Sequence, residues 1–311
     1  MRRTVFVAML VVVGGLSMAA AGLQQQQQKL PTVRNIQKLR DNLYFISGGD
    51  VSDRSTWTGG NVMALVTNNG VVLVDTMLPG AGKSIIAQVK SVTDKPITTI
   101  INTHTHFDHT GSNTEFPATV EFVAHENTRA NLARATCQPV TNCDAFKGDN
   151  AKYLPKKTYK DKLTLLGGKN QIDLYYFGRG HTSGDTFVVF PALRAMHAGD
   201  MFPRAQIPFI DFANSGGSAT EFSQTLQGAV TTIKNVDTVV GGHTPQPVTW
   251  NDFKTYTDFY KDFLTSAQEA KKKGTSVDDF AKAYKVPDKY KGFNADAGGV
   301  KANAQAIYDG K

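Results

Sequence analysis

The sequence predicts an α+β fold in which two β-rich stretches are each followed by helices. Short runs of branched and aromatic residues, separated by turn signals, occupy 33–76 and recur at 161–200, and such runs are typical of strands. Amphipathic helical patterns follow both stretches, at 81–92 and 219–235. Because a strand, helix, strand order indicates a right-handed crossover, we expect mixed sheets inside and helices outside.

The first half contains the four strand-like runs VRNIQKL, NLYFISG, NVMALVT and VVLVDT. Turn signals such as NNG separate them. Ile85, Ile86 and Val89 then recur at the spacing of one helix face, which predicts the helix at 81–92. The pattern returns to a strand in PITTIINTH, at 96–104.

The second half repeats this arrangement with the runs DKLTLLGG, QIDLYYFG, TFVVFPA and RAMHAGD, then the helix at 219–235 and a last strand, VDTVVGGH. Beyond it, aromatic residues recur every three or four positions at 250–273. This spacing predicts a helix packed on the domain rather than an aromatic binding site. We therefore expect one main domain at 32–248 and a C-terminal helical extension at 249–311.

The N-terminus has the pattern of an export signal. Two arginines precede an apolar run at 5–16 that is too short to span a bilayer, and small residues at 19–21 favour cleavage. We expect a signal peptide at 1–21 and a polar, glutamine-rich leader at 22–31. Since no cysteine follows the apolar run, we expect a periplasmic or secreted protein without membrane association after cleavage.

The formal net charge of +7 over 311 residues is mildly basic, and no basic and aromatic stripe accompanies it. This pattern indicates a solvated face, so nucleic acid is not an expected partner. The chain has two cysteines, Cys137 and Cys143. Export favours a disulfide between them, with two unlinked thiols as the alternative, and no neighbouring histidine supports a metal role.

The stretch INTHTHFDHTG, at 101–111, contains three of the seven histidines. Side chains at i and i+2 share a face in an extended backbone, so His104 and His106 point the same way at the strand end. If the chain then turns into a helix, Asp108 and His109 come round to that side and offer an oxygen and a nitrogen to a second ion. The cluster therefore indicates two metal ions, because imidazoles buried without a metal need other partners.

Three further candidates lie at other strand ends. His181, Asp200 and His243 each follow a strand-like run and have glycine beside them, which permits close approach to an ion. Each alone is equally compatible with a loop histidine or a capping aspartate, but together they complete two sets of metal ligands. His125 and His197, at a helix start and within a strand, are interpreted as structural.

The motifs LVDT, THTHFDHTG, GRGHTSGD, HAGD and GGHTP resemble, in order and spacing, the five motifs of the metallo-beta-lactamase superfamily. The resemblance covers about 43–243 and makes 32–248 a catalytic domain. It implies a four-layer αβ/βα sandwich with two metals at one edge of the sheets. The implied ligands are His104, His106 and His181 for the first metal, Asp108, His109 and His243 for the second, and Asp200 between them, with Asp75 orienting the histidine loop.

The resemblance also implies an exported hydrolase of small molecules. Two Zn²⁺ ions would share a hydroxide that opens the amide or ester carbonyl of a β-lactam-like or lactone-like ring, with Asp108 or Asp200 relaying the proton. The two-zinc β-lactamases of the family commonly place cysteine or serine at the position of Asp200, whereas aspartate there is similar to glyoxalase II and the lactone hydrolases. The sequence predicts no oligomeric state.

Other functions stay open. A thioester hydrolase of the glyoxalase II type is one alternative. An iron-dependent sulfur or oxygen oxidoreductase is another, because nitrogen and oxygen ligands suit iron as well as zinc. A metal-stabilised binding protein without turnover is a third.

Two other stretches are polar or glycine-rich. SGGDVSDRSTWTGGN, at 47–61, lies between two strands, and we expect it to cover the substrate with Trp57 as an apolar platform. A solvent-exposed turn with a packed tryptophan is the alternative. The run PGAGKSII is similar to a phosphate-binding loop, but Met77 stands where the first glycine is required, so we do not expect nucleotide binding.

Overall fold

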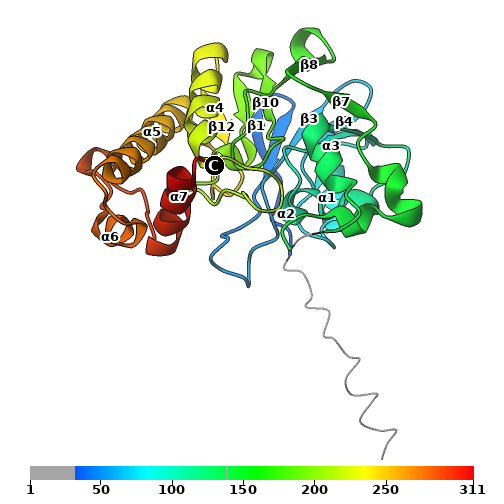
Figure 1. Ribbon diagram of the computed structural model, residues 1–311. Helices are drawn as coiled ribbons and strands as arrows, with labels where there is room; N and C mark the ends of the chain where they lie inside the picture. Colours follow the sequence, from blue (N-terminus) through cyan, green and yellow to red (C-terminus); the bar gives the residue numbers. More distant parts are fainter. Residues whose placement is uncertain (1–31, 138) are drawn as a thin grey trace, which may run out of the picture. The chain divides into compact units, whose positions relative to one another are not determined.

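The computed structural model describes residues 32–137 and 139–311 (Figure 1), so the expected signal peptide and leader lie outside the described residues. Within this part of the chain the strands form one sheet of seven strands and one of six. None of its helices is long and apolar enough to cross a membrane.

The first sheet joins β1 to β7 in chain order. Strands β1 to β4 are antiparallel, and β5, β6 and β7 continue the sheet parallel to β4. Because β4 and β5 are parallel, with Val74 opposite Ile101, their carboxyl ends meet at one edge. The seven strands are Gln37–Arg40, Leu43–Ile46, Val62–Val66, Val71–Val74, Ile97–Ile101, Glu121–His125 and Lys157–Tyr159.

The second sheet has the order β13, β12, β11, β10, β9, β8. Only its β11–β12 pair is parallel, with His197 opposite Val240, so the segments that follow these two strands leave the sheet at the same edge. From β8 to β13 the strands are Lys162–Leu165, Ile172–Tyr175, Phe187–Phe190, Ala195–His197, Thr238–Val240 and Val248–Thr249.

The two sheets pack face to face. Val188 and Phe190 of β10 share a buried cluster with Phe45 of the first sheet, whereas Phe187 and Val189 face the helices on the other side. This alternation is the period of two that a strand buried on both faces requires. The main core therefore lies between the sheets, with a second core under the C-terminal helices.

Helices cover both outer faces. Figure 1 shows α1 and α3 beside the first sheet and α4 and α5 beside the second. This arrangement confirms the αβ/βα sandwich with a C-terminal helical part. The helices are α1 Gly82–Lys90, α2 Phe107–Thr110, α3 Glu126–Leu132, α4 Ala219–Thr232, α5 Trp250–Lys272, α6 Val277–Ala283 and α7 Ala297–Asp309.

One helix is shorter than its pattern suggests. Helix α4 ends at Thr232 rather than near 235, because Ile233 takes an extended backbone and Asn235 a left-handed one, with φ of 57°. Ile233 is only 2% exposed, so its burial in the core under the helices outweighs one more helical turn.

The aromatic stripe at 250–273 is packing surface. Helix α5 starts with a capping box between Thr249 and Asp252. Its residues Phe253, Tyr256 and Tyr260 are fully buried in the second core. The stripe therefore anchors the extension rather than forming a binding site.

A disulfide joins Cys137 to Cys143, as expected. The loop that it closes lies against the histidine motif, since the Phe107 amide donates to the carbonyl of Val140 at 3.1 Å. A β-bridge also pairs His106 with Thr141. The disulfide loop is thus one wall of the region where the strands end.

Candidate metal centre

The histidine motif begins where two parallel strands end. Asp75 follows β4 and Thr103 follows β5, and Asp75 accepts hydrogen bonds from the Thr103 amide at 2.8 Å and from Oγ1 of Thr103 at 2.7 Å. Asp75 adopts φ of 63°, a left-handed conformation that aspartate tolerates better than most residues. Its Oδ2 also accepts from Nδ1 of His109 at 2.7 Å. Asp75 therefore orients the motif, and no part of its side chain is exposed.

The first cluster consists of His104, His106 and His181, whose ligand atoms all lie within 4.8 Å of one another. Nδ1 of His106 and Nε2 of His181 are 2.9 Å apart. Nε2 of His104 is buried and has no hydrogen-bond partner among the described residues. A buried nitrogen without a partner is costly unless it binds something absent from the chain itself, so these three nitrogens are suited to one metal ion.

The other nitrogen of each ring is held by the protein. Nδ1 of His104 lies 3.0 Å from Oγ1 of Thr103, which already donates to Asp75 and so can only accept here. Nε2 of His106 donates to Asp211 at 3.2 Å, and Nδ1 of His181 donates to the carbonyl of Phe209 at 2.7 Å. These contacts leave an unprotonated nitrogen on each ring directed into the cluster.

The second cluster consists of Asp108, His109 and His243. Nε2 of His243 lies 3.3 Å from Oδ2 of Asp108 and 3.4 Å from Nε2 of His109. His109 and Asp108 come from the short helix α2, where the chain turns after the strand end. His243 comes from the segment that follows β12. One oxygen and two nitrogens are thus directed towards a second position that could hold a metal ion.

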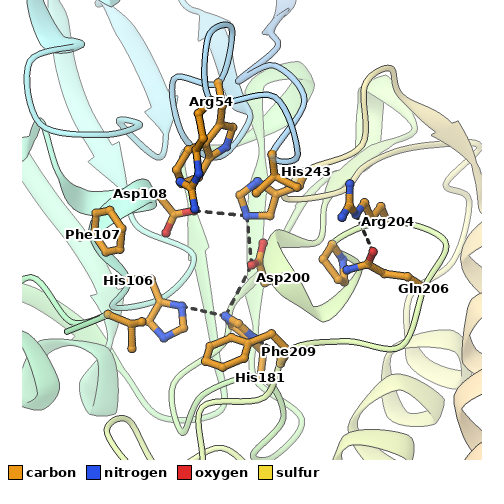
Figure 2. A pocket seen from close by; sticks show the side chains of 14 residues that line it. Arg54, His106, Phe107, Asp108, His181, Asp200, Arg204, Gln206, Phe209 and His243 are labelled. Atoms are coloured by element: carbon orange, nitrogen blue, oxygen red, sulfur yellow. Dashed lines mark hydrogen bonds and ion pairs between the residues drawn. The ribbon is translucent and has the colours of Figure 1, made fainter. Parts of the chain in front are cut away.

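Asp200 lies between the clusters, as Figure 2 shows. Its Oδ2 is 3.2 Å from Nε2 of His243 and 3.5 Å from Nε2 of His181, and its Oδ1 is 3.4 Å from Nε2 of His109. A carboxylate in this place can give one oxygen to each of two ions. All seven expected ligands and Asp75 are therefore brought to one place.

Two glycines allow this close approach. A Cβ at Gly242 would lie 1.7 Å from Oδ1 of Asp200, and a Cβ at Gly60 would lie 2.2 Å from Cε1 of His109. The glycine beside His243 was expected to permit close approach to an ion. Its direct effect is different, because it makes room for the Asp200 carboxylate.

The charges of the site are arranged for metal binding. Burial lowers the pKa of His104 well below its usual value and also lowers that of His181, which favours neutral rings. Burial lowers the pKa of His109 as well, but Asp108, Asp200 and Asp75 outweigh it, so the pKa of His109 is raised well above the usual value. A metal ion at His109 must therefore displace a proton, as metal binding to histidine generally does.

Asp200 is ionised. Burial raises the pKa of Asp200, but His243 and His109 outweigh the burial and hold that pKa well below its usual value. The donor set of five imidazoles and two carboxylates, together with the unpartnered Nε2 of His104, fits zinc, and it fits iron as well because no thiolate is present to select between them.

The two remaining histidines are structural, as expected. His125 caps helix α3 by accepting from the Asn127 amide and donates to the carbonyl of Lys160 at 2.8 Å. His197 donates to the carbonyl of Asn61 at 3.0 Å and accepts from the Gly199 amide.

A cavity of about 370 Å³ opens onto both clusters. Trp57 lines it, is 6% exposed, and lies 6.2 Å from the His243 ring, measured between centroids. The guanidinium of Arg54 lies 4.6 Å above the Trp57 ring. Arg204 lines the other side and bonds to Gln206 at 2.7 Å. The cavity thus combines two arginines with an apolar wall; the apolar residues are Val51, Trp57, Phe107, Val140, Pro203 and Phe209.

Sequence reasoning missed Asp211, Phe209 and the two arginines. Asp211 is 105 positions from His106 in the chain, and Phe209 acts through its backbone carbonyl, which no residue pattern reveals. Only the FIDFANS run around Asp211, polar within an apolar stretch, gives a weak signal.

Comparison with known proteins agrees with this geometry. The family model of the Metallo-beta-lactamase superfamily matches residues 55–253. The chain belongs to this superfamily. As a metallo-beta-lactamase superfamily member it is a metal-dependent hydrolase.

Its relatives in sequence have diverse activities. A "Metallo-beta-lactamase type 2" of Elizabethkingia meningoseptica is 23% identical over 258 residues, which cover 83% of this chain and 95% of that protein. The α subunit of a 2,4-dinitroanisole O-demethylase from Nocardioides is 29% identical over 142 residues, 44% of this chain and 40% of that protein.

Solved structures share the fold of this superfamily member at low identity. A metallo-beta-lactamase from Pontibacter korlensis has a TM-score of 0.59 at 18% identity, and the match covers 74% of this chain and 99% of that one. The sec-alkylsulfatase Pisa1 from Pseudomonas has a TM-score of 0.68 at 13% identity, covering 88% of this chain and 50% of that one. The sulfatase match therefore extends over more of this chain.

Proposed function

We propose that the protein is an exported hydrolase with two zinc ions that opens the amide or ester carbonyl of a small cyclic compound, either a β-lactam or a lactone. The observation that carries the proposal is Asp200, whose carboxylate lies within 3.5 Å of histidines from both ligand clusters. Two metal sites that share a carboxylate and open onto a cavity are typical of hydrolases in which the metals stabilise both the attacking atom and the leaving atom of the bond that is cut.

Each ligand has a defined atom. Nε2 of His104, Nδ1 of His106 and Nε2 of His181 would hold the first zinc, and Oδ2 of Asp108 with Nε2 of His109 and of His243 would hold the second. When bound, two zinc ions supply a Lewis acid for the carbonyl and water activated near neutral pH. The protein contributes the orientation of these rings through Asp75, Asp211 and the Phe209 carbonyl.

Asp108 is the residue best placed to move a proton. It lines the cavity and 13% of its side chain is exposed, whereas both oxygens of Asp200 face imidazoles. We assign Asp108 the role of accepting a proton from the attacking water and passing it to the leaving nitrogen or oxygen. Asp200 stays ionised because its pKa is held low, so it serves mainly to link the two sites.

The cavity wall supports a substrate with an apolar body and an anionic group. Trp57, Phe107 and Phe209 offer flat apolar surfaces. Arg54 and Arg204 reach the same cavity from two different loops, as Figure 2 shows, and can pair with a carboxylate. Trp57 is thus proposed as the platform on which the ring of the substrate rests.

The aspartate at position 200 also supports a second candidate. A thioester places the same kind of carbonyl between the two sites, and an all-nitrogen and oxygen ligand set accepts iron as well as zinc. An iron-dependent oxidoreductase is a separate candidate, which iron as the natural metal would favour.

A substrate panel tests the proposal. The purified protein, loaded with zinc, is assayed on a chromogenic cephalosporin, a simple lactone, a thioester and a phosphodiester, with the Asp200→Ala variant as control. We expect turnover of the cephalosporin or the lactone that disappears in the variant. Preference for the thioester would replace the substrate class, and stoichiometric iron in protein purified without added metal would replace the metal. Full activity after metal removal would contradict the proposal as a whole.

A further inference from the structure

A segment that links the metal centre to the C-terminal helices carries two supports of the first histidine cluster. We call residues 205–211 the strap. The Phe209 carbonyl in the strap accepts from His181, and the Asp211 carboxylate accepts from His106. Two of the three rings of the first cluster therefore take their orientation from the strap.

The other side of the strap pairs with the C-terminal extension. The Asn294 amide donates to the carbonyl of Ala205 at 2.9 Å, and the Ile207 amide donates to the carbonyl of Asn294 at 2.9 Å. Nine residues further along the extension, Nδ2 of Asn303 in α7 donates to the carbonyl of Pro208 at 2.9 Å. This bond is made at the residue directly before Phe209.

Packing holds the strap on either side of Phe209, where Ile207 and Ile210 are 2% and 3% exposed. The Phe209 side chain is 56% exposed, so burial of its ring does not fix its carbonyl. A cavity of about 420 Å³ separates much of the strap from the start of α7, with Phe209 on one wall and Gly299 and Asn303 on the other. Pro208 and Asn303 both line this cavity, and the hydrogen bond between them joins its two walls.

Asn303 is itself held in position by hydrogen bonds to α7 and α5. It is 1% exposed, and its Nδ2 also donates to the carbonyl of Gly299, one turn back in α7. Its Oδ1 accepts from the hydroxyl of Tyr260 in α5 at 3.2 Å, and that hydroxyl also lies 3.0 Å from the carbonyl of Ala219 at the start of α4. A satisfied buried network of this kind specifies a position more strictly than apolar contact does.

We infer that Asn303 is a positioning residue of the metal centre, which acts through the strap on the first histidine cluster. The inference rests on the proposed two-metal function, since it assigns the C-terminal extension to the support of one of the two sites. Loss of an outer partner of a metal-bound histidine typically costs 10-fold to 100-fold in metal affinity. Asn303 acts one link further out, so we expect about a 10-fold loss at the lower end of that range.

The test compares two variants of the same network. Asn303→Ala removes the hydrogen bond to the Pro208 carbonyl of the strap. Tyr260→Phe removes the hydrogen bond from Tyr260 to Asn303 but keeps the one from Asn303 to Pro208. Zinc affinity is measured by competition with a chromophoric chelator, which resolves two binding steps, and unfolding is followed for each metal-free variant. We expect Asn303→Ala to weaken one step about 10-fold and leave the other unchanged, and Tyr260→Phe, which keeps the bond to Pro208, to weaken that step by less.

Two further variants locate the effect. Asp211→Asn should weaken the same zinc-binding step as Asn303→Ala. The double variant should lose less zinc-binding free energy than the two single variants together, because both changes act on the first cluster. If Asn303→Ala does not fold, Asn303→Asp replaces it, since this side chain keeps the size and the acceptor for Tyr260 but cannot donate to Pro208 when ionised.

The outcomes separate this inference from the proposed function. A parent protein that binds two zinc ions, with an Asn303→Ala variant that binds them equally well or loses both steps to the same degree, overturns the role of Asn303 alone. A parent protein that binds no zinc overturns both.

Discussion

The two ligand clusters differ in what holds them. His109 of the second cluster is oriented by Asp75, 34 positions away in the chain and at the end of the strand next to β5. His106 of the first cluster is oriented by Asp211, 105 positions away on the strap. Strand register therefore places Asp75, whereas Asp211 lies on the strap, whose other end pairs with the C-terminal extension.

This difference shows which supports of the metal centre depend on contacts from other parts of the chain. A support at the end of a paired strand moves only if the sheet moves, because register fixes every side chain along it. A support on a loop depends on whatever covers that loop, which here is the segment around Asn294 and Asn303. The supports that the strap gives to His106 and His181 are thus open to adjustment by the extension, whereas Asp75 is not.

The largest effect is expected where the two clusters meet. Asp200→Ala removes the carboxylate that lies within 3.5 Å of His181 and of His243. Activity should fall by about 1,000-fold, because several kcal/mol of metal-assisted stabilisation is lost. Steady-state kinetics at saturating zinc measure the change, and circular dichroism checks the fold. Activity within a few-fold of the parent would show that the clusters work separately.

The comparison itself is tested by Asp75→Asn and Asp211→Asn. Asp75→Asn should weaken both zinc-binding steps by about 10-fold to 100-fold, because Asp75 holds His109 directly and His104 through Thr103. Asp211→Asn should weaken one step by a similar factor. Chelator competition on both variants under one set of conditions measures this. If Asp211→Asn also weakens both steps, the support from the strap is not confined to the first cluster and the contrast between the clusters is wrong.

The two sides of the cavity give a smaller effect. Trp57 lies beside His243 and is 6% exposed, whereas Phe209 lies beside His106 and is 56% exposed. Trp57→Ala should raise KM about 10-fold with little change in kcat and should lower stability, since it deletes a buried ring. Phe209→Ala, on the exposed wall of the same cavity, should change stability by less than about 0.5 kcal/mol. Unchanged KM and kcat in Trp57→Ala would remove the platform role.

The smallest effect concerns a surface link between the sheets. Asp237, next to β12, accepts from Arg194 at 2.8 Å and from Arg40 of β1 at 2.7 Å, and these bonds lower the pKa of Asp237 to about 2. A folded-state pKa below the unfolded one stabilises the fold above about pH 4, and this stabilisation is lost as the pH falls towards 2. The Asp237 side chain is 45% exposed, so solvent screening limits the effect to less than about 1 kcal/mol.

Urea unfolding of Asp237→Asn at pH 7 and at pH 2.5 measures this contribution. The variant should be slightly less stable at pH 7 and should approach the parent at the lower pH. Asp41→Asn, the same change of charge in the turn after β1, is the control. An equal loss at both pH values would exclude the ion pairs as the cause.

Much of the site follows from short-range pattern. In INTHTHFDHTG an extended strand end directs His104 and His106 the same way, and the turn into α2 brings His109 beside them. His181, Asp200 and His243 were predicted because each follows a strand and adjoins glycine. The parallel pairs bring these strand ends to one edge within each sheet, and the packing of the two sheets brings the two edges together.

The outer supports could not be predicted in this way. Asp211, the Phe209 carbonyl and Asn303 have no spacing, no motif and no residue type that separates them from ordinary loop and helix positions. The meeting of Arg54 and Arg204 likewise depends on two loops that are far apart in the chain.

The sequence by itself predicted the fold class, the family and the seven candidate ligands that the structure brings together, because these depend on local periodicity and on side-chain chemistry. Only the tertiary structure decided which atom of each histidine faces its cluster and which distant helix supports the strap. The physical reason is that a hydrogen bond requires its two atoms within about 3 Å of each other, and for residues a hundred positions apart that distance depends on the packing of the whole chain.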